Sequence, residues 1–177
     1  MRKVTRAALV LAGSAALIGV TTVPSFAATE GTTTTTVAVT GGGLAITVPE
    51  TTPLTGAAPG ATSSTLLGDT VVTDTRAGTD NWTATVNLPE LTATVGTATE
   101  TIPTTGATYV ASVGTQTGTP TMATIATVTN LVTGGTSQGT TAVSGNNSAT
   151  WPATLTVPIP DQALAATYTG TLTQSVS

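Results

Sequence analysis

Apolar and polar residues alternate along most of the chain beyond residue 30, and no helical repeat is found past residue 20. Because successive side chains of a strand point to opposite faces, this alternation predicts half-buried β-strands. Segments rich in Gly, Pro and Thr separate the alternating runs at short intervals, as turns do. The predicted strands cover residues 33–39, 44–48, 66–75, 82–88, 91–95, 108–113, 122–128, 149–159 and 168–176.

About nine short strands joined by such turns indicate an all-β fold, mostly antiparallel, of the immunoglobulin-like β-sandwich type. In the run 82–88 every second residue is apolar, which predicts one buried face and a hairpin with the strand that ends near Thr75. The polar, Gly-rich segment 134–147 predicts a long hairpin loop. Pro158 and Pro160 lack a backbone donor, so they favour a strand end or an edge.

The N-terminus has the composition of a secretory signal peptide. Arg2, Lys3 and Arg6 precede an apolar segment, residues 7–20, and small residues follow it up to Ala27. That segment is short and rich in Ala and Gly, which favours cleavage after Ala27 over an uncleaved membrane anchor. We therefore expect a signal peptide over residues 1–27 and a single secreted domain over residues 28–177, with no membrane insertion after cleavage.

The expected mature chain is acidic, and its charge limits the classes of partner that it can bind. It keeps Arg76 as its one basic residue against eight acidic residues. Nucleic acid and anionic lipid would be repelled by such a chain, so we expect neither as a partner. A neutral or zwitterionic glycan or peptide is compatible with this charge.

Residue types that carry chemistry are scarce. The chain has no His and no Cys, and Lys3 lies in the expected signal peptide. We therefore expect no catalytic residue, no cofactor and no metal. Two alternatives stay open: a Ca²⁺ site built from Asp69, Asp74, Asp80 and Asn81, whose spacing matches no known loop, and a glycosidase-like carboxylate pair.

Three segments of the chain resemble the WxL family of cell-surface domains of Gram-positive bacteria. Asp74-Thr75-Arg76 leads through a Gly-containing turn into Trp82-Thr83-Ala84-Thr85-Val86, as in the middle motif of the family. Residues 166–173 resemble the C-terminal motif, and residues 151–160 resemble an apolar strand of such domains. The resemblance covers about residues 35–177, although Ala84 and Gln174 stand where the motifs carry Leu and Trp.

The resemblance implies a non-catalytic domain that is secreted, extracellular and associated with the cell wall. Its partner would be peptidoglycan or another cell-wall glycan, held without a covalent bond. The alternative is a structural surface subunit that assembles with itself or with other surface proteins through its strand edges.

The candidate ligand-binding residues are Trp151, Arg76, Trp82 and Tyr168. Arg76 can pair with Asp74 within the hairpin or bind a peptide carboxylate of the wall. The aromatic residues can stack on sugar rings or pack in the core. We expect Trp82 in the core because it shares the apolar face of its strand, and Trp151 to be more exposed because it lies beside a Pro after the polar loop.

Overall fold

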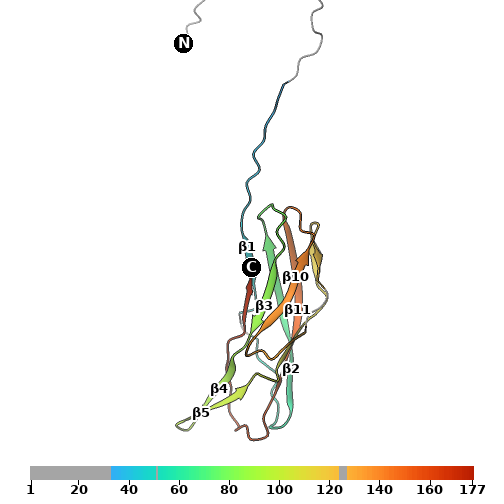
Figure 1. The fold of residues 1–177 in the computed structure, drawn as a ribbon. Coiled ribbons are helices and arrows are strands. Elements are labelled where there is room, and N and C mark those ends of the chain that lie inside the picture. Colours follow the sequence, from blue (N-terminus) through green and yellow to red (C-terminus); the bar gives the residue numbers. More distant parts are fainter. Residues whose placement is uncertain (1–32, 51, 124–126) are drawn as a thin grey trace, which may run out of the picture. The chain divides into compact units, whose positions relative to one another are not determined.

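The computed structural model describes residues 33–50, 52–123 and 127–177. Contacts within the chain separate a first unit, Met1–Val37, from a second unit, Ala38–Ser177. In the first unit the described residues, 33–37, are exposed and have no regular structure. The expected signal peptide lies outside the described residues. The second unit contains all the described regular structure, and every element of it is a β-strand (Figure 1).

The described strands form two sheets and a separate hairpin, and every pairing is antiparallel. The larger sheet has the order β1-β2-β11-β6-β9, with β7 also paired to β11. Its strands are β1 (Leu44–Thr47), β2 (Thr62–Asp74), β6 (Thr108–Ala111), β7 (Thr115–Thr117), β9 (Thr127–Thr129) and β11 (Asn147–Pro158).

The smaller sheet has the order β12-β3-β10-β8, and β4 pairs with β5 in the hairpin. These strands are β3 (Thr83–Asn87), β4 (Glu90–Val95), β5 (Ala98–Pro103), β8 (Thr121–Met122), β10 (Gly135–Thr141) and β12 (Thr173–Val176). The all-β, antiparallel fold predicted from the alternating pattern is confirmed.

One hydrophobic core joins the two sheets, as in a sandwich. Along β11 every second side chain from Ala149 to Val157 is buried, and the Thr residues between them are partly exposed. The facing strand β3 buries Ala84 and Val86, and Trp82 and Leu88 extend the same face beyond its two ends. The predicted apolar face of residues 82–88 is therefore confirmed.

Pro152 lies inside a central strand and is accommodated by a bulge. The pairing of β11 with β2 shifts between Trp151 and Ala153, so Gly68 and Asp69 together lie opposite Pro152. A Pro cannot donate to a ladder, and a bulge removes that requirement. On its other side β11 pairs with β7 before the Pro and with β6 after it. The single Pro thus divides the neighbours of β11 into two groups.

Three predicted elements are wrong. Residues 33–39 form no strand, because no described segment pairs with them. Residues 82–88 do not form a hairpin with β2, since β3 pairs with β10 and β12 instead. The polar segment 134–147 is not a long loop, because it contains β10, a central strand of the smaller sheet, whose Ser137 donates to the backbone of Ala84.

Other predicted strands differ in extent or number. Residues 122–128 belong to β8 and β9, and residues 124–126 lie outside the described part of the chain. Residues 168–176 form a strand only from Thr173, and before it Thr169 makes an isolated antiparallel bridge to Thr92 of β4. The short strands β5 and β7 were not predicted, since neither carries a clear apolar alternation.

Gly114 lies at the crossing between β6 and β7, and its missing side chain permits close packing. A Cβ at Gly114 would overlap the carbonyl oxygen of Thr150 and come within 2.9 Å of the Trp151 Cβ. We expect Gly114→Ala to lower the free energy of unfolding by about 1–3 kcal/mol, as overpacking does. Chemical denaturation measures this change. Gly56→Ala is the matched control because a Cβ there meets nothing within 4 Å, and equal losses in both variants would contradict the prediction.

Candidate functional site

Asp74 and Arg76 form the predicted ion pair at the end of β2. Arg76 Nε donates to Asp74 Oδ1 at 2.9 Å, and Arg76 Nη2 donates to Asp74 Oδ2 at 3.0 Å. Arg76 Nη2 also donates to the backbone carbonyl of Asp80 at 2.9 Å. Such two-point contacts fix the guanidinium in one geometry. The pair therefore closes the turn that carries the chain from β2 to Trp82.

Because the Asp74 side chain is buried, its ionised form depends on hydrogen bonds from neighbouring groups. The Asp74 side chain is 2% exposed, and the Arg76 side chain is 29% exposed. Hydrogen bonding from the Arg76 side chain is the largest cause that lowers the pKa of Asp74 to about 2; burial opposes the shift. The Arg76 backbone and Asn147 contribute smaller lowering effects. In return, the hydrogen bond to Asp74 raises the pKa of Arg76.

Asn147 connects the ion pair to the aromatic core. Its Nδ2 donates to Asp74 Oδ2 at 3.1 Å, and its Oδ1 accepts a 3.1 Å bond from the indole Nε1 of Trp82. The Trp82 ring lies parallel to that of Trp151, with centroids 6.1 Å apart and 14° between the planes. Arg76, Asp74, Asn147, Trp82 and Trp151 thus form one continuous chain of contacts between the two sheets.

Both tryptophans are buried, at 1% exposure for Trp82 and 0% for Trp151. The expected core position of Trp82 is confirmed. The expected exposure of Trp151 is wrong, because inward and outward side chains alternate without interruption along β11, and Trp151 falls on the inward face with Ala149 and Ala153. Neither indole lies at the surface, where a sugar ring could stack on it.

Gln174 links β12 to the larger sheet. Its Oε1 accepts a 3.1 Å bond from the Tyr109 hydroxyl and a 3.2 Å bond from Thr70 Oγ1. Burial raises the pKa of Tyr109, with opposition from the nearby Trp151 and Thr70 side chains. The Trp151 indole nitrogen, although close to this hydroxyl, has no hydrogen bond within normal geometry. Gln174 therefore supplies a polar contact between the sheets.

Tyr168 lies at a large open cleft that the sequence did not predict. The cleft has a volume of about 960 Å³. Its floor consists of core side chains such as Leu88, Leu91 and Leu155, and its rim comes from residues 48–50, 52–57, 59 and 163–172. The Tyr168 hydroxyl donates to the backbone carbonyl of Leu164 at 3.1 Å, which fixes the ring against the rim. Tyr168 is the only one of the four candidate ligand residues that lines this described cleft.

The cleft combines apolar surface with uncharged hydrogen-bonding groups. Hydroxyl groups along the rim come from several Thr residues, and Ser63 and Gln174 add polar groups deeper in the cleft. Glu50 is the one acidic residue in the described lining. This lining favours a neutral ligand that offers both hydroxyl groups and apolar faces, as sugars do.

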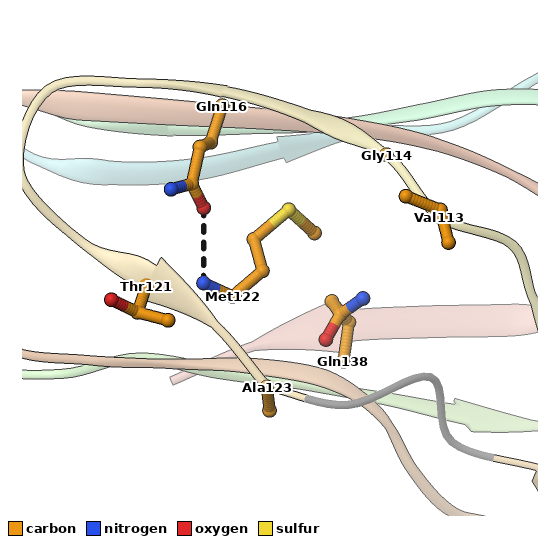
Figure 2. Close-up of a pocket in the computed structure, with 7 residues that line it drawn as sticks. All are labelled: Val113, Gly114, Gln116, Thr121, Met122, Ala123 and Gln138. Carbon is orange, nitrogen blue, oxygen red and sulfur yellow. Dashed lines mark hydrogen bonds between the residues drawn. The ribbon is translucent and has the colours of Figure 1, made fainter.

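A second, smaller pocket lies between the two sheets near β7 and β8 (Figure 2). It has a volume of about 390 Å³ and no charged residue in its described lining. Figure 2 shows Gln116 and Met122 on facing segments, where the Met122 N–H donates to Gln116 Oε1 at 2.9 Å. Gln138 projects from β10 toward the same space, and its Oε1 accepts a 3.1 Å bond from the Gly139 N–H.

The arrangement of acidic residues provides no metal cluster in the described part of the chain. No group of three or more His, Cys, Asp or Glu side chains is positioned to hold an ion among residues 33–50, 52–123 and 127–177. Asp74, one of the four residues considered for Ca²⁺, is bonded to Arg76 and Asn147. Within the same residues, no helix has the length and apolar character needed to cross a membrane.

Comparisons of the chain with protein-family models, with curated proteins and with solved structures gave no match.

The ion pair makes stability depend on acid pH. Because the pKa of Asp74 is lowered in the folded protein, its stabilising effect is complete above its ordinary pKa near 3.8 and disappears as pH falls through about 2. We expect the difference in unfolding free energy between the native chain and Asp74→Asn to shrink by about 2 kcal/mol between pH 6 and pH 2. Urea denaturation at a series of pH values measures it. The exposed Asp69→Asn is the control, and a pH-independent difference for Asp74→Asn would contradict the prediction.

Asn147 satisfies two buried groups at once. Asn147→Ala leaves the Trp82 indole N–H and one Asp74 oxygen without this partner, so we expect a loss of about 1–3 kcal/mol in unfolding free energy. In the Trp82→Phe background, which lacks the indole donor, the same substitution is expected to cost less. A double-mutant cycle by chemical denaturation measures the coupling, and strict additivity would show that the Asn147–Trp82 bond contributes nothing.

Proposed function

We propose that the protein is a secreted, non-catalytic cell-surface domain that associates non-covalently with peptidoglycan of a Gram-positive cell wall. The observation that carries the proposal is the cleft beside Tyr168, which is large, open and nearly free of charge. Its volume of about 960 Å³ lies in the range of ligand sites, which is about 300–1,000 Å³. The resemblance of residues 74–86 and 166–173 to WxL motifs supports the choice of the wall as the partner.

The chemistry of the cleft is suited to a glycan strand with short peptides. In this proposal Tyr168 and the apolar floor contact sugar faces, and hydroxyl groups of the rim, such as those of Thr169 and Thr171, bind sugar and amide groups. A paired carboxylate for glycoside hydrolysis is lacking in the described lining, where Glu50 is the single acid. These features support binding rather than cleavage.

Arg76 has a positioning role in this proposal. Its guanidinium is bonded to Asp74 and to the Asp80 carbonyl, and Arg76 is not part of the cleft lining. A peptide carboxylate would have to compete with Asp74 for the same donors. The cleft is therefore preferred over Arg76 as the binding site, and the motif residues serve to hold the sandwich together.

The test is a pull-down of residues 28–177 with insoluble peptidoglycan from which teichoic acid has been removed. We expect saturable binding that free muropeptides compete away, and an increase of about 5-fold in Kd for Tyr168→Ala, the loss of one aromatic contact of about 1 kcal/mol. Tyr168→Phe keeps the ring and is expected to bind nearly as well as the native chain.

Leu66→Ala is the matched control, because Leu66 is exposed and is not part of the cleft lining. Circular dichroism of every variant establishes that it is folded. Absence of binding by the folded native chain would overturn the wall-binding proposal. Binding that Tyr168→Ala leaves unchanged would keep the wall as the partner but move the site away from the cleft.

A further inference from the structure

Residues 33–40 have the chemistry of a strand but no partner among the described residues. The segment reads Thr33-Thr34-Thr35-Thr36-Val37-Ala38-Val39-Thr40, is uncharged, and is rich in β-branched side chains that favour strands. Val37 is 86% exposed and Val39 is 80% exposed, the two highest values among the exposed large apolar residues. In a strand both would point to one face, with Ala38 on the other.

The outer edge of β12 offers backbone groups to such a strand. Ser177 exchanges two hydrogen bonds with Thr83, at 3.0 and 2.8 Å, and β12 pairs with no described strand other than β3. In an antiparallel pair these bonded positions alternate, so Ser175 and Thr173 also face β3. The N–H and C=O groups of Gln174 and Val176 therefore point to the open edge.

An apolar seam lies between β12 and β1, the two strands at this side of the sandwich. β1 is the edge of the larger sheet and lies near β12, but it pairs only with β2. Four apolar side chains pack against the core while remaining partly exposed: Leu44 and Ile46 of β1, Val176 of β12, and Leu172 just before β12. The core is thus incompletely covered along this seam.

We propose that residues 33–40 of one copy add as a strand to the open edge of β12 of a second copy, with Val37 and Val39 facing the seam. The strand would satisfy the edge groups of β12 and cover partly exposed apolar side chains at the same time. Neither the segment nor residues 171–177 contain a charged side chain, so the contact is expected to depend only weakly on salt. This inference does not depend on the wall-binding proposal.

A second copy fits the edge better than the chain's own segment. Gly42 N–H donates to the Thr75 carbonyl at 2.6 Å, and Gly43 N–H donates to Thr75 Oγ1 at 3.0 Å, so the backbone is fixed up to Gly42. A Cβ at Gly41 would overlap the Arg76 carbonyl, which shows how tightly this residue is packed. A reversal onto the same chain's β12 would have to take place at these fixed residues. Addition to another copy joins two different surfaces and so builds open chains of molecules.

Engineered cysteines provide a direct test, because the chain contains none of its own. Ala38→Cys is made in one preparation of residues 28–177, and Thr173→Cys or Ser175→Cys in another, all at positions whose side chains are exposed. After mixing and mild oxidation we expect a disulfide-linked heterodimer, identified by mass spectrometry. Thr117→Cys, exposed on β7 and separated from β1 by β2 and β11, is the control partner and is expected to cross-link at least 5-fold less.

A second measurement keeps the test independent of cross-linking geometry. Sedimentation velocity of the native chain is expected to show species that grow with concentration, and Val37→Asp with Val39→Asp is expected to restore the monomer. Leu66→Asp, a charge at another exposed apolar position, is expected to leave the assembly unchanged. The proposal would be overturned by a native chain that stays monomeric to millimolar concentration, or by cross-links no more frequent than with Thr117→Cys. Either result would count whatever the outcome of the peptidoglycan pull-down. Cross-linking only within a chain carrying both cysteines would assign the segment to its own edge and also overturn it.

Discussion

The fold depends on keeping one buried carboxylate ionised. Asp74 is the last residue of β2, and its side chain is buried, so water cannot solvate it. An unpaired charge at this position would cost several kcal/mol. Arg76 and Asn147 donate hydrogen bonds to this carboxylate. Asn147 also accepts a hydrogen bond from the indole N–H of Trp82. The turn after β2, the first residue of β11 and the residue before β3 must all be in place for these hydrogen bonds to form. A local electrostatic requirement thereby specifies how the two sheets meet.

The alternating pattern was sufficient wherever a strand buries an apolar face. β11 was predicted almost to its ends, since Leu155 and Val157 alternate with Thr in the sequence. The pattern was insufficient for β10 (Gly135–Thr141), which contains no apolar residue. This segment is a strand because its neighbours β3 and β8 provide hydrogen-bonding partners. The opposite error arose at residues 33–39, which have the pattern of a strand but no partner strand in the part of the chain that the structure describes. Pairing is a property of the whole fold, and a single segment does not encode it.

The site was predictable only in part, for a related reason. Asp74 and Arg76 are two residues apart, so their pairing follows from strand geometry alone. The contact of Trp82 with Trp151 joins residues far apart in the sequence, so it follows from how the two sheets pack and not from a local pattern. The cleft has even less local signal, because its rim is assembled from segments of irregular structure before β2 and before β12. Tyr168 was identified as a candidate by residue type, and its position at the cleft came from the fold.

The hydrogen bonds that hold the Arg76 guanidinium have a consequence for proteolysis. Beyond the expected signal peptide the chain has no Lys and a single Arg, so trypsin has one peptide bond to cut, after Arg76. Trypsin must draw that guanidinium into its own pocket, where an acidic residue holds it. In the folded protein Asp74 and the Asp80 carbonyl already hold the same group. The rate of a single tryptic cut therefore reports how often this turn opens, because the ion pair must break before the one susceptible bond can be cleaved.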